Sequence, residues 1–195
     1  MPANAPLLVV VAGPNGAGKS TTAPRLLQEA LAVSEFVNAD AIALGLSAFR
    51  PESAAVAAGR AMLGRLRALS LTRRDFAFET TLAGRSLMPR IDRLRESGYH
   101  VHVVFLSLAS PDLALARVAE RVAQGGHDVP TEVVRRRFVA GLRNFFSLCE
   151  DRVDSWQVFD NSLPTGPRLI AARSAGEKRR ILDTRAWSRL LEQGR

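Results

Sequence analysis

A glycine-rich stretch near the start of the chain constrains the fold more than any other feature. Gly13, Gly18, Lys19 and Ser20 have the spacing G-x-x-x-x-G-K-S, directly after the apolar run 7–12 and directly before a helical pattern. Glycines let the backbone approach phosphate oxygens, and the N–H groups that open a helix can hold an anion. The spacing therefore predicts a strand–loop–helix unit that binds a phosphate chain.

Lys19 and Ser20 give this loop the side chains that the binding of a nucleotide requires. We expect Lys19 to reach the β- and γ-phosphates of ATP and Ser20 to place its hydroxyl on Mg²⁺. Lys19 and Lys178 are the only lysines among the 27 basic residues, and a compact ammonium suits this contact better than a planar guanidinium. The alternative is an ordinary glycine-rich turn. The predicted cofactors are ATP and Mg²⁺, and the predicted loop contacts are Gly13, Pro14, Asn15, Gly16, Ala17, Gly18, Lys19, Ser20 and Thr21, with Ser20 as the metal ligand.

Short apolar segments alternate with longer helical patterns, which is typical of βαβ units and a mainly parallel sheet. The first segment is apolar at every position, as in a strand that helices cover on both faces. We therefore expect an α/β fold, a three-layer P-loop NTPase-type fold with about five or six strands flanked by helices. The expected strands span residues 7–12, 35–38, 76–79, 100–106, 156–160 and 168–172, and the expected helices span residues 21–31, 41–46, 51–69 and 112–124, with a further helix capped by Thr131.

Length and composition indicate one globular domain. The 195 residues are 47% hydrophobic and 24% charged, the usual make-up of a soluble domain. No repeat or Pro/Ser-rich linker divides the sequence. We expect a single domain over residues 1–195, with a helical flap at 110–150 and a helical tail at 174–195.

The cysteine content and the first residues bear on the compartment. Cys149 is the single cysteine, so it has no partner for an intramolecular disulfide, which favours a reducing compartment. The first residues lack a basic n-region, and the run 7–12 is far shorter than the ~18 residues of a membrane span. We therefore expect a cytoplasmic protein that does not bind a membrane.

The net charge of +8 attracts anions and raises the question of a nucleic-acid partner. The arginines are scattered through every segment and do not alternate with aromatic residues that would stack on bases. We therefore expect a small anionic metabolite as the partner and disfavour nucleic acid. An ATP-gated nucleic-acid-binding module remains the alternative from another class, and a steep loss of affinity with salt would identify it.

Asp40 and Glu79 are the candidates for the catalytic chemistry, because each stands at or just after the end of a predicted strand. The strand expected at 100–106, in contrast, ends in Ser107 and has no acid there. The carboxyl ends of parallel strands line the ligand crevice of an open sheet, so both acids can face the γ-phosphate. A carboxylate there can accept the proton of an acceptor hydroxyl, as a kinase requires. The alternatives are N-capping of the helix at 41–46 for Asp40 and a metal-shell or loop role for Glu79.

Arginines flank a glycine-bearing break at residues 125–130. Arg117 and Arg121 precede the break, and Arg135, Arg136 and Arg137 follow it. A mobile flap with arginines at both hinges could close over the triphosphate and neutralise charge that develops on the transferred group. The alternative is a solvated helix face. We expect Arg117 and Arg121 to contact ATP, and Arg121 to be catalytic as well.

The three histidines are expected to be structural. His100 and His102 alternate on one strand face, which indicates packing within the sheet, and His127 is expected to hydrogen-bond within the flap loop. Three histidines without cysteine partners disfavour a zinc centre.

The ordered set of motifs resembles the zeta-toxin-like P-loop kinases. The resemblance runs in order from residue 7 to about residue 161, most of the chain, and the ordered set is more specific than the glycine-rich loop alone. The motifs are GPNGAGKST at 13–21, NAD at 38–40, FETTL at 78–82, RVAQGGHDVP at 121–130, RRF at 136–138 and DNS at 160–162.

The resemblance implies an activity and a partner. Zeta toxins transfer the γ-phosphoryl group of ATP to the 3′-hydroxyl of the sugar in UDP-N-acetylglucosamine, and an epsilon antitoxin holds them inactive. By this resemblance Asp40 is the catalytic base beside Lys19 and Arg121, and an antitoxin protein is a partner. The resemblance and the strand-end argument together predict substrate contacts from Asp40, Glu79, Thr80, Thr81, Arg136 and Arg137.

One departure from the family affects the substrate. The chain is shorter than the well-known toxins, which carry extra substrate-binding elements, and residues 176–195 match none of the motifs. The resemblance therefore predicts the fold and the reaction type of this chain better than it predicts the acceptor. A kinase of another small molecule is the first alternative.

Overall fold

The structure is a computed structural model that describes residues 5–126 and 128–195. Its strands are β1 (Leu7–Ala12), β2 (Phe36–Val37), β3 (Phe76–Thr80), β4 (His100–Ser107), β5 (Ser155–Asp160), β6 (Arg168–Arg173) and β7 (Arg180–Ile181). Within the described residues these seven strands form one sheet in the order β2-β3-β1-β4-β5-β6-β7. The first five run parallel, and β6 and β7 run antiparallel to their neighbours. The expected α/β fold with a mostly parallel sheet is confirmed.

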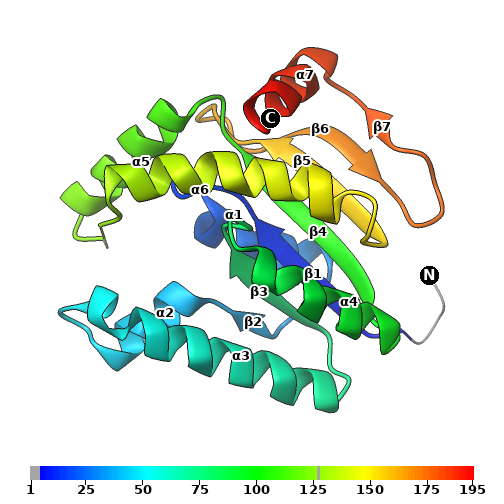
Figure 1. The fold of residues 1–195 in the computed structure, drawn as a ribbon, viewed down its shortest axis with the longest axis horizontal. Helices are drawn as coiled ribbons and strands as arrows, with labels where there is room; N and C mark the ends of the chain where they lie inside the picture. The colour runs from blue at the N-terminus through cyan, green and yellow to red at the C-terminus, as the bar shows by residue number, and fades with distance from the viewer. Residues whose placement is uncertain (1–4, 127) are drawn as a thin grey trace.

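Helices cover both faces of the sheet and give the molecule three layers (Figure 1). They are α1 (Lys19–Arg25), α2 (Ala39–Leu46), α3 (Ala55–Leu71), α4 (Met88–Glu96), α5 (Pro111–Ala123), α6 (Thr131–Asn144) and α7 (Thr184–Gln193). α4, α5 and α6 pack on one face of the sheet, and α1 packs on the other. α2 and α3 pack against each other beside the β2 edge. In the described part of the chain, no helix is both long and apolar enough to cross a membrane.

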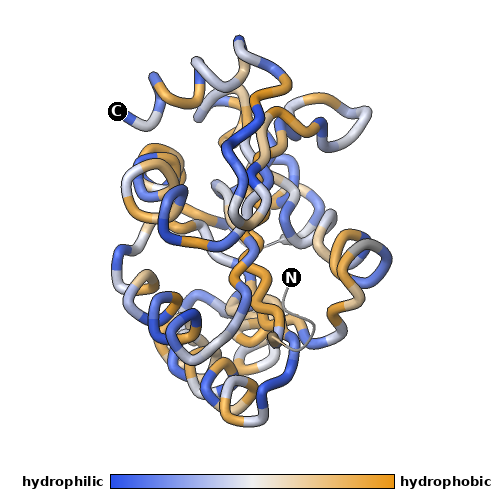
Figure 2. The backbone as a smooth tube through the Cα atoms, turned by 90° about the vertical axis from the view of Figure 1, so that its right-hand side faces the viewer, coloured by the Kyte–Doolittle hydropathy of each residue, from blue (hydrophilic) through white to orange (hydrophobic). Residues whose placement is uncertain are grey.

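β1 is buried on both faces, which explains its continuous apolar sequence. Leu8 and Val10 belong to the core under α4, α5 and α6, whereas Val9 and Val11 belong to the core under α1. Successive side chains of a strand point to opposite faces, so both sets must be apolar in a central strand. Figure 2 shows apolar strands running through the middle of the molecule. The glycine-rich loop therefore leaves from the centre of the sheet.

The first helix differs from the expected range. α1 spans Lys19–Arg25 and continues into a π-helical turn, Leu26–Ala30. Pro24 lies inside α1 and has no N–H to donate one turn back, and a wider turn follows it. The expected cap of the α6 helix was also wrong, because α6 begins at Thr131 itself and Pro130 takes the cap position without a side-chain hydrogen bond.

α4 was not predicted from the sequence. It is short and rich in arginine, so its apolar stripe is weak. Met88 and Ile91 are nevertheless buried three residues apart, and Leu94 packs against the core one turn later. This spacing of three is the helical signal that was available in the sequence.

The last segment of the chain forms a hairpin and a helix. β7 pairs with β6, and α7 follows with Asp183 as its N-cap, which accepts a hydrogen bond of 2.9 Å from the backbone N of Ala186. Trp187 of α7 stacks on Trp156 of β5 with 5.7 Å between the ring centroids. β7 is therefore the edge strand of the sheet on the side opposite to β2.

His100 and His102 of β4 both form a hydrogen bond with the side-chain hydroxyl of Ser155. Ser155 Oγ lies 2.9 Å from His100 Nε2 and 2.8 Å from His102 Nδ1, so both rings pack within the sheet. Burial lowers the pKa of His102 to about 4, and the neighbouring His100 acts in the same direction, against a hydrogen bond with Gln157 that raises it. The folded protein therefore holds His102 in its neutral form.

This burial predicts a loss of stability in mild acid. The pKa of histidine in an unfolded chain is about 6.5, and that of folded His102 is about 4. The stability that depends on neutral His102 is therefore complete above pH 6.5 and falls as the pH drops towards 4. Between pH 7 and pH 5 the free energy of unfolding should fall by about 2 kcal/mol from this group. Urea unfolding of the wild type and of His102→Gln at both pH values measures it, and equal losses in the two proteins would refute the assignment.

Candidate active site

Two glycines of the loop between β1 and α1 lie in tight contact with other segments. A Cβ on Gly13 would lie 2.2 Å from the carbonyl oxygen of Leu106 at the end of β4, and a Cβ on Gly18 would lie 2.7 Å from Nδ2 of Asn161. Gly18 also has a φ of 77°, a left-handed conformation that side chains disfavour. The loop is thus fixed against the ends of two other strands, which explains the glycines at both positions.

Lys19 is buried beneath this loop. Its Nζ donates a hydrogen bond of 2.9 Å to the carbonyl oxygen of Pro14 and lies 3.6 Å from Oε1 of Glu79. Burial lowers the pKa of Lys19, and the charge of Arg121 acts in the same direction, whereas Glu79 and Asp40 raise it. Lys19 thus lies among two acids and a second basic side chain, directly beneath the loop that is expected to hold a phosphate group.

Glu79 at the carboxyl end of β3 joins three side chains. Its Oε2 accepts hydrogen bonds from Ser20 Oγ at 2.7 Å and from Asn38 Nδ2 at 2.8 Å, while its Oε1 faces Lys19. Mg²⁺ prefers oxygen ligands and is commonly held by one or two protein groups together with water and substrate phosphates. The neighbouring oxygens of Ser20 and Glu79 fit this requirement.

Asn38, and not Asp40, is the N-cap of α2, so the capping role considered for Asp40 is wrong. α2 begins at Ala39, and Oδ1 of Asn38 accepts hydrogen bonds from the backbone N of Asp40 at 2.8 Å and of Ala41 at 3.2 Å. Asp40 therefore lies in the first turn, with an exposed side chain that does not cap the helix. Sequence reasoning did not assign Asn38 to the site, although asparagine is as strong a cap as aspartate.

The two functions of Asn38 can be separated by substitution. Serine caps a helix about as well as asparagine, but its side chain is too short to reach Glu79 as well, and alanine can do neither. We expect Asn38→Ala to unfold with about 1 kcal/mol less free energy than Asn38→Ser. Urea unfolding of both variants checks this difference. Equal stabilities would mean that the cap contributes nothing.

One cavity of about 400 Å³ brings most of the predicted residues together. It opens between the glycine-rich loop, α2, α3 and the end of β3, and residues of α5 and α6 complete it. Three cations and two acids thus line one space. Ten of the lining residues were predicted from the sequence, and they are Asn15, Gly16, Lys19, Ser20, Asp40, Glu79, Thr80, Thr81, Arg121 and Arg137.

Seven predicted residues are not among those that line the cavity. Four of them belong to the glycine-rich loop itself, namely Gly13, Pro14, Ala17 and Gly18, and the other three lie elsewhere. Thr21 lines a different hollow beside α1. Arg117 donates hydrogen bonds to the carbonyl oxygens of Asn161 at 2.7 Å and Ser162 at 3.0 Å, on the loop after β5. Arg136 is exposed and is not among the residues that line the cavity.

The α6 helix explains the difference between Arg136 and Arg137. Val134 and Phe138 are buried one turn apart and define the inner face of the helix. Arg137 follows Val134 by three residues and lies beside this face, whereas Arg136 lies on the opposite side. His127, which was expected to hydrogen-bond within the flap loop, lies outside the described residues.

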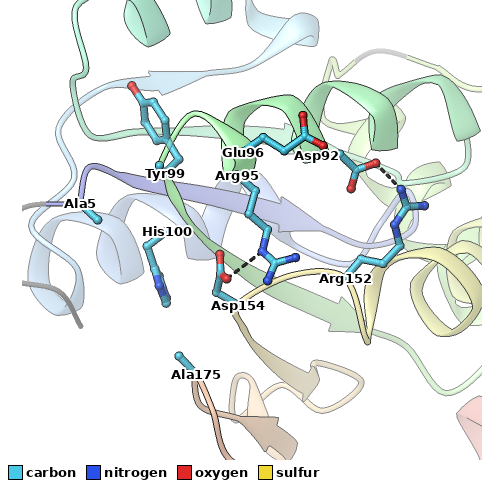
Figure 3. Close-up of a pocket in the computed structure, with 10 residues that line it drawn as sticks. Ala5, Asp92, Arg95, Glu96, Tyr99, His100, Arg152, Asp154 and Ala175 are labelled. Atoms are coloured by element: carbon cyan, nitrogen blue, oxygen red, sulfur yellow. Dashed lines mark hydrogen bonds and ion pairs between the residues drawn. The ribbon is translucent and has the colours of Figure 1, made fainter.

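A larger cavity of about 640 Å³ opens at the other end of the sheet (Figure 3). Four of its charged residues form two ion pairs: Arg95 lies 2.8 Å from Asp154, and Arg152 contacts Asp92. The glycine-rich loop is remote from it, because β4 begins at this end with His100 whereas the loop leaves the carboxyl end of β1. Because the larger cavity is remote from the glycine-rich loop and four of its charged side chains are engaged in ion pairs, the smaller cavity is the candidate active site.

Comparison with known proteins agrees with this geometry. A protein-family model described as an AAA domain matches residues 8–148. An uncharacterized protein of Haemophilus influenzae is 31% identical over 126 residues, which are 65% of this chain and 88% of the relative.

Several solved structures share the fold. The complex of AvrRxo1-ORF1 and AvrRxo1-ORF2 with sulphate ions matches with a TM-score of 0.75 and 18% identity, over 96% of this chain and 64% of the other. The same complex was also solved with ATP. A structure of the PezAT chromosomal toxin-antitoxin system of Streptococcus pneumoniae matches with a TM-score of 0.61 and 16% identity, over 81% and 68% of the two chains.

A gluconokinase from Sinorhizobium meliloti matches with a TM-score of 0.55 and 20% identity, over 82% of this chain and 85% of the enzyme. Together these likenesses show a P-loop kinase-like fold. The chain spans less than two thirds, 64%, of the AvrRxo1 chain that it matches.

Proposed function

The chain belongs to the AAA domain family, and from this premise and the geometry of the cavity we propose that it is an ATP-dependent phosphotransferase. It transfers the γ-phosphoryl group to a hydroxyl of a small anionic metabolite. The observation that carries the proposal is that Lys19, Ser20, Glu79 and Asp40 line the same cavity. A phosphate-binding loop and a carboxylate in the same cavity are the parts that phosphoryl transfer to a hydroxyl requires.

Each group has a role in this proposal. Lys19 and Arg121 stabilise the negative charge of the transferred group. Ser20 and Glu79 would hold Mg²⁺, which, when bound, neutralises charge on the phosphates. Asp40 accepts the proton of the acceptor hydroxyl, and its exposed side chain leaves it accessible to that hydroxyl.

The remaining predicted contacts divide between the two substrates. The backbone of Gly13, Gly16 and Gly18 cradles the phosphates. On the acceptor side, Thr80 and Thr81 at the end of β3 contact the acceptor, and Arg137 binds its anionic group. Residues 1–195 form one kinase domain in this proposal, and α5 and α6 act as the flap.

The acceptor that we propose is a nucleotide sugar, with UDP-N-acetylglucosamine as the specific compound. The motifs that resemble those of zeta toxins support this choice of acceptor, and so does the likeness of the fold to the PezAT toxin-antitoxin structure. We propose an antitoxin protein as a partner on the same grounds, since the matched AvrRxo1 structure is a complex of two proteins.

One experiment tests the reaction. The protein is incubated with Mg²⁺ and ATP labelled at the γ-phosphate, in separate reactions with UDP-N-acetylglucosamine, with gluconate and with a deproteinised cell extract. We expect label in an organic phosphate that chromatography resolves from inorganic phosphate. Label only in inorganic phosphate would make the protein an ATPase, and binding of nucleic acid that weakens steeply with salt, without transfer, would favour the nucleic-acid alternative.

A further inference from the structure

Gly59 of α3 lines the candidate active site and leaves space there. A Cβ built on Gly59 would meet no atom within 4 Å. Glycine inside a helix is less favourable than alanine, and at this position no close approach of another segment requires it. The absence of a side chain at Gly59 therefore needs an explanation outside packing.

The same face of α3 is filled by side chains one and two turns later. Gly59, Met62 and Leu66 lie at spacings that place them on one face of a helix. Leu66 is 7% exposed in the main core, and Met62 packs against that core. Gly59 and Met62 of this face line the cavity, whose lining also includes Leu63 and Leu87.

We propose that Gly59 sets the size of the acceptor site by leaving room for a ring next to the reacting hydroxyl. This inference rests on the proposed phosphotransferase function. A sugar-like ring has weakly polar C–H faces that suit Met62, Leu63 and Leu87, and hydroxyl groups that suit Thr80 and Thr81. An acceptor without a ring would leave water against the apolar side of the cavity.

Gly64 provides a matched control on the same helix. A Cβ on Gly64 would also meet no atom within 4 Å, but Gly64 is exposed and does not line the cavity. Changes at the two positions therefore share the effect of helix propensity and differ in whether the new side chain enters the cavity. Both Gly59→Ala and Gly64→Ala should raise the melting temperature by about 2–4 °C.

The test measures where the labelled phosphate goes. Wild type, Gly59→Leu and Gly64→Leu are incubated with γ-labelled ATP, Mg²⁺ and the deproteinised cell extract, and label in organic phosphates is compared with label in inorganic phosphate. Water is small enough to enter a filled cavity, so Gly59→Leu should lower the ratio of organic to inorganic label by about tenfold or more. Gly64→Leu should keep the wild-type ratio, and ATP affinity by calorimetry should be the same in all three proteins.

Different results separate failure of this inference from failure of the proposed function. Equal ratios in Gly59→Leu and Gly64→Leu would overturn the role of Gly59 while the kinase function stands. A wild type that labels no organic compound would overturn the proposed function and this inference with it. If Gly59→Leu melts below the assay temperature, Gly59→Ala is assayed in its place, and Gly64→Ala serves as its control. A smaller fall in the ratio of organic to inorganic label is then expected for Gly59→Ala.

Discussion

Replacing Lys19 with methionine is expected to reduce phosphoryl transfer by about 10²-fold or more, because it removes a charge that stabilises the transferred group. Methionine keeps the unbranched stem, and burial already disfavours the charge on Lys19. Glu79 would still accept hydrogen bonds from Ser20 and Asn38. The fold should therefore survive, and the melting temperature measured beside single-turnover transfer separates catalysis from stability.

The second lysine of the chain is the control for this prediction. Lys178 is exposed and lies outside the cavity, so Lys178→Met removes the same charge at a position that contacts no substrate. It should keep wild-type transfer. An active Lys19→Met variant, or equal losses in both variants, would contradict the phosphate role of Lys19.

Asp40→Asn is expected to lower phosphoryl transfer by ~10²–10⁴-fold while the affinity for Mg·ATP changes little. Asparagine keeps the size of the side chain and removes the oxygen that takes the proton. A loss of helix capping does not contribute to this result, because Asn38 and not Asp40 caps α2. Calorimetry with Mg·ATP and single-turnover transfer give the two quantities.

Glu79→Gln is the matched comparison for Asp40→Asn. Glu79 contacts Lys19 and Ser20 directly, so loss of its charge should weaken binding of Mg·ATP first. If Asp40→Asn weakens ATP binding instead, Asp40 belongs to the metal site. If it leaves transfer unchanged, Asp40 has no part in the chemistry.

The parts of the site that follow local rules could be predicted from the sequence. The loop from Gly13 to Ser20 is one such part, because its spacing, the apolar strand before it and the helix after it are adjacent in the chain. The positions of Asp40 and Glu79 followed from a general property of parallel sheets. Both acids line the same cavity as Lys19.

The parts that depend on contacts between distant segments could not be predicted. Asn38 and Asp40 are equally good caps by type, and only the register of α2 decides between them. Arg117 pairs with carbonyl groups of a loop more than forty residues away. The open space beside Gly59 likewise depends on how α3 packs against α2 and beside β2, which no residue near it in sequence determines.

The two edges of the sheet have a consequence for the behaviour of the protein at high concentration. β2 and β7 are each two residues long. An edge strand exposes unpaired backbone groups that can pair with another chain, and very short edges offer too few of them for a stable ladder. Arg180 adds a charge at one edge. The sheet is therefore protected against edge-to-edge aggregation on both sides, and long apolar strands such as β1 and β4 remain inside it.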